Sequence, residues 1–177
     1  MPEGRLRESR RGASRADVIV VTKCPETLSE DLKDEYRQRI GVYAPGTPVF
    51  FSNISYNEPR GGALDPKQEV ILFSGIANPQ QLREYAGERY KVISEHTYGD
   101  HHSFTKNELN KLVSEARAHN AALLTTEKDY RRIQPELLGE IEKSASLAYI
   151  PIETVVNNGQ EFDTFIRNRI DKYASSR

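Results

Sequence analysis

The chain has 177 residues, of which 37% are hydrophobic and 29% are charged, and its net charge is −1. This length allows one domain or a domain and a part, and the composition allows a folded core. The near-neutral charge excludes a bulk attraction to nucleic acid, and the lack of an apolar run of about 18 residues excludes a membrane span. A single cysteine, Cys24, excludes an internal disulfide framework and fits a reducing compartment.

The first third of the chain alternates between strand and helix patterns. Residues 17–22 form a nearly continuous apolar run, which predicts a buried parallel strand. Residues 29–40 predict a helix with Ser29 as its N-cap, and residues 48–54 predict a second strand. Residues 55–68 then carry proline, glycine and aspartate without periodicity, so we interpret them as a hinge.

Strand and helix patterns alternate regularly after residue 68. Strands are predicted at residues 70–73, 90–96, 121–125 and 147–150. Helices are predicted from Asn78 and Pro79 to near Gly87 and at residues 105–119, and residues 126–129 cap a further short helix. The last predicted helix places Phe162, Phe165, Ile166, Ile170 and Tyr173 along one stripe. This alternation predicts an α/β fold with a mainly parallel sheet flanked by helices. The predicted parts of the chain are residues 1–54, the hinge at 55–68, and a C-terminal α/β subdomain at 69–177.

Four polar loops follow the predicted strands, at residues 22–25, 74–79, 98–102 and 125–129. Ligands of open α/β sheets bind beyond the carboxyl ends of the strands, so we expect these loops to share one side of the sheet. Each loop also has a simpler interpretation. The first is more typical of a plain strand exit, the second is equally typical of a tight turn, and the last modestly favours a site over a surface ion pair.

The third of these loops contains the sequence Asp-His-His-Ser at residues 100–103. The helix that follows opens with a capping box, in which Thr105 and Glu108 satisfy each other's backbone N–H groups. An acid and an imidazole at a helix N-terminus lie where backbone N–H groups attract anions such as phosphate. The motif therefore predicts that these residues accept or donate a proton during phosphoryl transfer or hydrolysis. A polar loop with its own capping hydrogen bonds explains it about equally well.

Three signatures of nucleotide and metal sites are absent from the sequence. They are the phosphate loop Gly-x-x-x-x-Gly-Lys-[Ser/Thr], the pattern Gly-x-Gly-x-x-Gly, and Cys-x-x-Cys. From its residues alone, the chain is an α/β protein with a polar, anion-handling edge.

Five stretches, taken together and in order, resemble the tetraacyldisaccharide 4'-kinase family, which phosphorylates the lipid A precursor of lipopolysaccharide. They are residues 4–8, 15–25, 75–79, 100–104 and 125–129. The resemblance covers essentially the whole chain but only about half of the family's length. The other half of the family's proteins carries the phosphate-binding loop, the acids that hold magnesium, and a hydrophobic element that meets the membrane.

The resemblance implies that the chain is the C-terminal half of such a kinase, by natural truncation or by choice of the expressed segment. Its fold is then the C-terminal part of a P-loop-type kinase without the P-loop, and residues 1–54 are the tail end of the kinase core domain. The implied cofactors are ATP and Mg²⁺, whose main ligands this chain lacks. The implied partners are the lipid A disaccharide precursor and the N-terminal half, in the cytoplasm or at the cytoplasmic face of the inner membrane.

The resemblance also implies roles for particular residues. His101, beside Asp100, matches the histidine that forms a dyad with an upstream aspartate and assists deprotonation of the sugar hydroxyl. Arg5 and Arg7 match a stretch near the cleft, and their forked guanidinium groups suit phosphate oxygens. Further candidate substrate or phosphate contacts are Ser74, Gly75 and Asn78. The candidate nucleotide or cleft residues are Thr125, Thr126, Glu127, Lys128 and Asp129, and no metal ligand is assigned.

Two other functions stay open at this point. One is a non-catalytic α/β module that binds a nucleotide or a protein, because the chain alone lacks the groups that stabilise phosphoryl transfer and is expected to have little or no kinase activity. The other is a phosphoesterase of the DHH type, suggested by residues 100–102. That chemistry needs two metals held by several aspartates, and no Asp-x-Asp cluster lies upstream.

Overall fold

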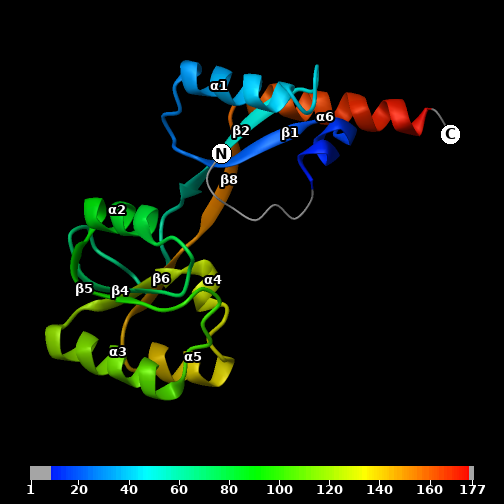
Figure 1. Ribbon diagram of the computed structural model, residues 1–177. Helices are drawn as coiled ribbons and strands as arrows, with labels where there is room; N and C mark the ends of the chain where they lie inside the picture. The colour runs from blue at the N-terminus through cyan, green and yellow to red at the C-terminus, as the bar shows by residue number, and fades with distance from the viewer. Residues whose placement is uncertain (1–8, 176–177) are drawn as a thin grey trace. The chain divides into compact units, whose positions relative to one another are not determined.

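The computed structural model describes residues 9–175, which form two compact units (Figure 1). Unit 1 combines the N-terminal part of the chain, up to Ser55, with the residues from Thr154 onward. Unit 2 runs without interruption from Tyr56 to Glu153. No helix within residues 9–175 has the length and apolar character that a membrane crossing requires.

This division corrects the one drawn from the sequence at two places. The hinge predicted at residues 55–68 lies almost wholly inside unit 2, because part of it forms a short strand of that unit's sheet. The residues from Thr154 onward were predicted to stay with the C-terminal subdomain, but they return to unit 1. Aromatic packing explains the return, since Phe50 contacts Phe162 and Phe165 with ring centroids 5.1 and 6.2 Å apart.

Unit 1 contains a three-stranded sheet with the strand order β1-β2-β8. Strands β1 and β2 are parallel, as predicted. Ser29 caps α1 as predicted, with its hydroxyl accepting a hydrogen bond from the backbone of Leu32. The elements centred on this sheet are η1 (Arg10–Arg15), β1 (Ile19–Cys24), α1 (Glu30–Gly41), β2 (Val49–Tyr56), β8 (Ile152–Val156) and α6 (Gly159–Ala174).

Unit 2 contains a five-stranded sheet with the order β3-β7-β6-β4-β5. Its pairings are parallel except for the antiparallel pair of β3 and β7, so the predicted mainly parallel sheet is confirmed. The elements are β3 (Arg60–Gly61), β4 (Glu69–Ser74), α2 (Gln80–Arg89), β5 (Lys91–Thr97), α3 (Lys106–His119), β6 (Ala122–Thr126), α4 (Glu127–Tyr130), α5 (Pro135–Glu142) and β7 (Leu147–Ile150).

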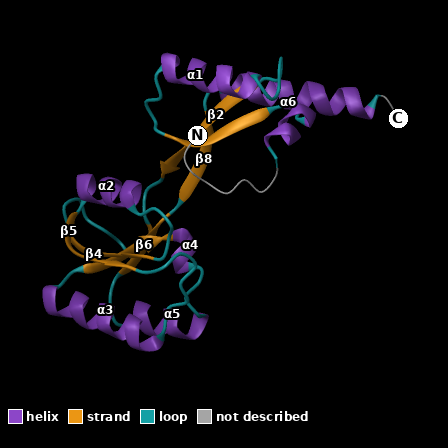
Figure 2. Ribbon diagram, viewed as in Figure 1, coloured by secondary structure: helices purple, strands orange, loops and turns teal. Residues whose placement is uncertain are grey.

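Strand β4 is apolar on both faces because helices cover both sides of the sheet. Val70 and Leu72 belong to the cluster that includes the α2 residue Leu82. The alternate residues Ile71 and Phe73 belong to a separate cluster with residues of α3 and α5. Figure 2 shows α2 on one side of the sheet and α3 and α5 on the other. Burial of each such side chain stabilises the fold by about 1.5–3 kcal/mol.

The neighbouring strands β4 and β6 send their connections to opposite faces of the sheet. The chain leaves β4 toward α2, and it leaves β6 toward α4 and α5. The two strands pair in parallel, from Val70 with Ala122 to Leu72 with Leu124. A switch point in the topology therefore lies between their carboxyl ends, which is where open α/β sheets bind ligands.

Several element boundaries differ from those predicted. Helix α2 begins at Gln80 rather than Pro79 and continues past Gly87 to Arg89. The N-cap is therefore Pro79 and not the predicted Asn78, although the Asn78 side-chain oxygen accepts a hydrogen bond from Gln80 N at 3.2 Å. The sequence patterns did not predict β3, α5 or β8, which are short. The two strands among them also depend on pairing with distant parts of the chain.

Candidate functional site

The carboxylate of Asp129 lies at the centre of the switch point and has no solvent exposure. Its Oδ2 accepts hydrogen bonds from Gly75 N at 3.0 Å and from the Thr126 hydroxyl at 2.8 Å. Its Oδ1 accepts one from Arg132 at 3.1 Å. The arrangement is local in origin, because the Thr126 hydroxyl also accepts a hydrogen bond from Asp129 N and thereby caps α4. Capping one short helix thus places a carboxylate against the loop that follows β4.

Gly75 lets three loops approach one another closely. A Cβ at this position would lie 3.0 Å from His102 Cβ, 3.2 Å from Gly99 O and 3.4 Å from the Asp129 carboxylate. Two of those neighbours belong to the loop that follows β5. The sequence predicted that the small residue at position 75 could admit a ligand. In the structure it instead lets neighbouring loops of the chain contact one another.

His101 projects from this cluster with its side chain 72% exposed. Its backbone is left-handed, with φ at +63°, and its N–H lies within hydrogen-bonding distance of Gly75 O at 3.2 Å and Asp100 Oδ1 at 3.0 Å. Its Nε2 lies 3.5 Å from Asp100 Oδ2, and Lys128 Nζ lies 3.7 Å from the other oxygen of that carboxylate. An exposed imidazole beside a carboxylate can hold or pass a proton.

Arg132 joins the three loops and was not predicted from the sequence. Its Nη1 donates to Gly75 O and to Asp129 Oδ1, both at 3.1 Å, and its Nη2 lies 2.9 Å from His101 Nδ1. The one signal in the sequence was its spacing, because an arginine three residues after an aspartate can form an ion pair on one helical turn. The sequence did not indicate that the same arginine would contact His101.

The N-terminus of α3 is occupied by the chain's own carboxylate. The predicted capping box is present, with Thr105 N donating to Glu108 Oε2 at 2.8 Å, and the same oxygen lies 3.1 Å from His102 Nε2. The backbone N–H of Thr105, followed by its hydroxyl and by His102, lowers the pKa of Glu108 to about 2. An incoming phosphate would meet this carboxylate, so the geometry favours the capping interpretation at this helix end.

The remaining predicted residues lie in varied places. Ser74 and Thr125 are buried at the ends of β4 and β6, with 2% and 0% exposure, which leaves neither side chain open to a ligand. Asn78 lies exposed at the start of α2, and Glu127 pairs with Arg131 at 2.6 Å.

Two predicted groups lie outside this cluster. The loop at residues 22–25 belongs to unit 1 and to the other sheet, so the expectation that all four loops share one edge is wrong. Arg5 and Arg7 lie outside the described residues.

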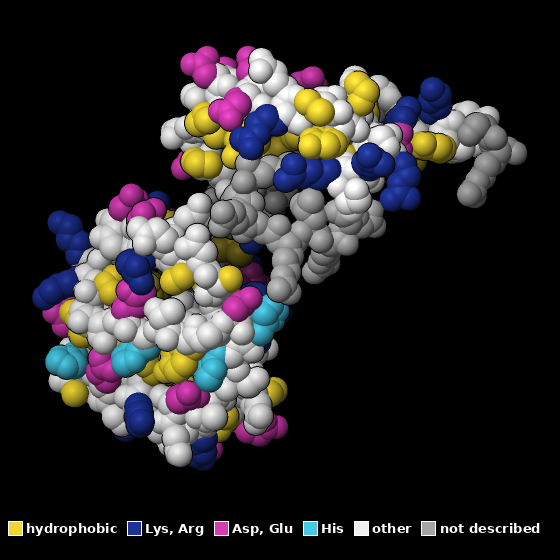
Figure 3. Space-filling view, viewed as in Figure 1, with side chains coloured by type: hydrophobic (Ala, Val, Ile, Leu, Met, Phe, Trp, Pro, Cys, Tyr) yellow, Lys and Arg dark blue, Asp and Glu magenta, His cyan; other side chains and the backbone are white. Residues whose placement is uncertain are grey.

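No ligand set for a metal ion occurs within residues 9–175, where no group of three or more His, Cys, Asp or Glu side chains is suitably placed. The phosphoesterase alternative therefore gains no support from the described part of the chain. All four histidines belong to unit 2, and Figure 3 shows exposed histidine side chains there among acidic ones.

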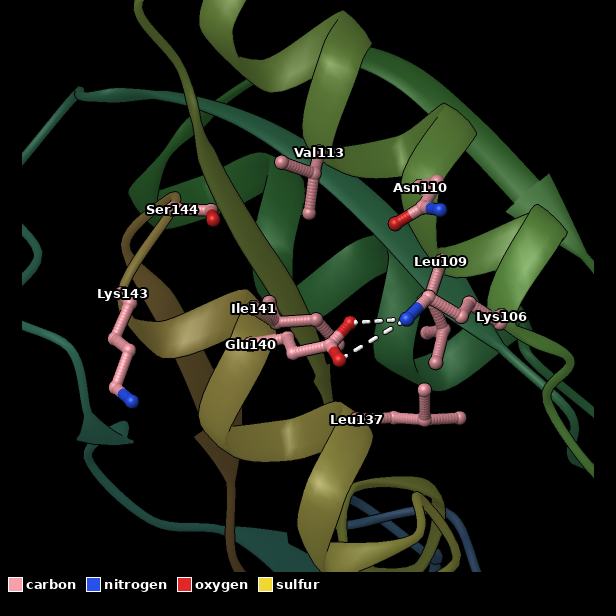
Figure 4. Close-up of a pocket in the computed structure, with 9 residues that line it drawn as sticks. All are labelled: Lys106, Leu109, Asn110, Val113, Leu137, Glu140, Ile141, Lys143 and Ser144. Carbon is pink, nitrogen blue, oxygen red and sulfur yellow. Dashed lines mark hydrogen bonds and ion pairs between the residues drawn. The ribbon is translucent and has the colours of Figure 1, made fainter.

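A separate hollow of about 300 Å³ lies between α3 and α5 (Figure 4). Apolar side chains line it on both helices, and the ion pair between Lys106 and Glu140 crosses its mouth at 2.8 Å. None of the residues proposed from the sequence for catalysis or ligand binding lines this hollow.

Comparison with known proteins decides the family. The sequence profile described as Tetraacyldisaccharide-1-P 4'-kinase matches residues 1–171. The chain belongs to the tetraacyldisaccharide 4'-kinase family. It is 35% identical over 175 residues to the tetraacyldisaccharide 4'-kinase of Flavobacterium johnsoniae, and 33% identical over 167 residues to that of Cytophaga hutchinsonii. These alignments cover 94% and 91% of this chain, but 48% and 46% of the relatives. The chain thus spans about half the length of the curated relatives it matches.

A solved structure supports the fold. The chain resembles LpxK from Aquifex aeolicus, crystallised in complex with ATP, with a TM-score of 0.51 and 20% sequence identity. The likeness covers 95% of this chain and 47% of that one. The predicted resemblance to part of a kinase of this family is therefore confirmed at the level of the fold.

We predict opposite effects of glycine at two exposed positions. At His101, whose backbone is left-handed, the His101→Gly variant should be more stable than His101→Ala by about 1 kcal/mol, because alanine resists this conformation. At Lys111, inside α3, the alanine variant should be more stable than the glycine variant by a similar amount. Urea unfolding of the four variants measures both differences. Equal stability of the two variants at position 101 would contradict the described backbone.

The capping carboxylate predicts a pH dependence of stability. Because the pKa of Glu108 is about 2 in the fold and 4.5 ordinarily, its stabilising effect is complete above about pH 4.5 and is lost as the pH falls toward 2. Glu108→Gln should therefore be less stable than the parent at pH 6, and the gap should narrow at pH 3. Urea unfolding at both pH values measures the gap, with the exposed Glu136→Gln as control. A gap that widens in acid would refute the assignment.

Proposed function

We propose that the chain serves the ATP-dependent phosphorylation of the lipid A disaccharide precursor at its 4' hydroxyl. The observation that carries this proposal is the exposed His101 beside Asp100, held at the switch point of a sheet in a chain of the tetraacyldisaccharide 4'-kinase family. Because the chain spans about half of its relatives, we assign it a part of that reaction rather than the whole.

The chemistry of the site suits one step of phosphoryl transfer. The acceptor hydroxyl must lose its proton as it attacks the phosphorus atom, and a positioned imidazole can assist that loss. His101 has the exposure that contact with a substrate needs. Asp100, Lys128 and Arg132 set the charge around it, with the Lys128 ammonium balancing the Asp100 carboxylate and the Arg132 guanidinium beside the ring.

No group of three or more His, Cys, Asp or Glu side chains that could hold a metal ion occurs among residues 9–175, and we assign no Mg²⁺ ligand there. The sequence also has no phosphate loop. We propose that ATP and Mg²⁺ are bound by the part of the family's proteins that this chain does not match. Action in the cytoplasm, or at the cytoplasmic face of the inner membrane, belongs to the same proposal.

A fusion protein tests this division of labour. The chain is joined to the N-terminal half of the Flavobacterium johnsoniae relative and assayed for transfer of labelled phosphate from ATP to tetraacyldisaccharide 1-phosphate. We expect turnover by the fusion and little or none by the chain alone. His101→Asn, which tolerates the left-handed backbone, should lower kcat about 100- to 10,000-fold because it removes the imidazole that assists the loss of the hydroxyl proton.

The matched control is His119→Ala, which removes an exposed histidine at the end of α3 and should leave kcat unchanged. Binding of ATP by each fusion shows that its N-terminal half is folded. Full activity of the His101→Asn fusion would contradict the proposed role of this residue. Turnover by the isolated chain would contradict the proposed division between the two halves.

A further inference from the structure

We infer that Arg132 is a positioning residue that fixes His101 as the tautomer with its proton on Nε2. The Arg132 Nη2 lies 2.9 Å from His101 Nδ1, within hydrogen-bonding distance. A guanidinium group is only a donor and keeps its charge, so the Nδ1 atom opposite it has to be the acceptor. A neutral imidazole carries one N–H and one acceptor nitrogen. The remaining proton therefore lies on Nε2.

The position of Arg132 is itself fixed from the interior. Its Nη1 donates to the Asp129 carboxylate, which is fully buried, and to the carbonyl oxygen of Gly75. The Arg132 side chain is 20% exposed, whereas the imidazole it contacts is 72% exposed. An anchored donor thus holds one edge of a ring that otherwise projects into solvent. This restraint reduces the number of ring orientations and tautomers that His101 can adopt.

The tautomer decides what a ligand meets at the exposed edge of the ring. With Nδ1 engaged by Arg132, the free nitrogen is Nε2, which lies 3.5 Å from Asp100 Oδ2. A group that approaches this edge therefore meets an N–H donor rather than a lone pair. His101 in this state assists the loss of the hydroxyl proton indirectly, by donating a hydrogen bond to a carboxylate that accepts that proton and by orienting it. The catalytic meaning of this arrangement rests on the proposed function, whereas the tautomer does not.

Nitrogen NMR of the 177-residue chain labelled with ¹⁵N-histidine tests the inference. Long-range ¹H–¹⁵N correlations distinguish a protonated ring nitrogen from an unprotonated one, and loss of one set of signals in His101→Asn assigns this residue among the four histidines. At a pH where the rings are neutral, we expect an unprotonated Nδ1 and a protonated Nε2 for His101. Arg132→Met should convert this pattern to the averaged one of a free, exposed histidine.

Two further variants separate positioning from a general loss of structure. Arg132→Lys keeps a donor and should preserve the Nε2–H pattern at least in part. Arg131→Met removes the neighbouring arginine, which pairs with Glu127, and should leave the His101 signals unchanged. Unchanged backbone amide signals from β4 and β6 show that each variant is folded. A protonated Nδ1 in the parent chain, or an unchanged pattern in folded Arg132→Met, would overturn the inference.

The fusion assay connects the tautomer to turnover. Arg132→Met in the fusion should lower kcat with little change in the KM for the disaccharide, and Arg132→Lys should recover part of the loss. If the NMR pattern is as inferred and the fusion is inactive, the proposed function fails while the positioning role stands. If the fusion is active and kcat does not respond to Arg132→Met, the catalytic meaning of the positioning fails while the proposed function stands.

Discussion

The buried carboxylate of Asp129 is the interaction on which the arrangement of the site depends. A charge without access to water costs several kcal/mol unless partners compensate it. Here the compensation comes from Gly75 N, on the loop after β4, and from the Thr126 hydroxyl and Arg132, on the segment after β6. Satisfying one carboxylate therefore forces the loop after β4 and the helix after β6 into a single geometry.

That geometry extends to the loop after β5, which carries the histidine. The carbonyl oxygen of Gly75 accepts from Arg132 and lies within hydrogen-bonding distance of the backbone N–H of His101. A Cβ at Gly75 would lie 3.0 Å from His102 Cβ. The sheet makes this possible because β4 is flanked by β5 and β6 and ends level with both. The exposed imidazole is in this way held in place by the largely buried residues Gly75, Asp129 and Arg132. A group that assists a proton transfer needs such a fixed position.

Local patterns in the sequence predicted much of unit 2. The apolar run at residues 70–73 indicated a strand buried on both faces, and Thr105 with Glu108 indicated the start of α3, because both signals depend on neighbours in sequence. The return of α6 to unit 1 depends on Phe50 meeting Phe162, a contact between distant residues that no local period encodes. For the same reason the sequence predicted Thr125 to be a cleft residue, although the sheet buries its side chain completely.

The site itself was predicted in part. The loop at residues 100–102 and the segment at 125–129 were singled out, and the structure brings them together through Gly75. The role of Arg132 was missed, since an arginine at this spacing is usually a surface ion pair. Its contact with His101 accompanies a left-handed backbone at that residue, a conformation that the sequence patterns did not predict.

Amide hydrogen exchange in the parent chain and in Asp129→Asn tests the central role of the buried carboxylate most directly. The Gly75 N–H donates to Asp129, so it should be strongly protected in the parent and should exchange many-fold faster in the variant. The amides of Ile71 and Leu72, inside β4, should change far less. Rapid exchange of Gly75 in the parent chain, or equal protection in both proteins, would contradict the account.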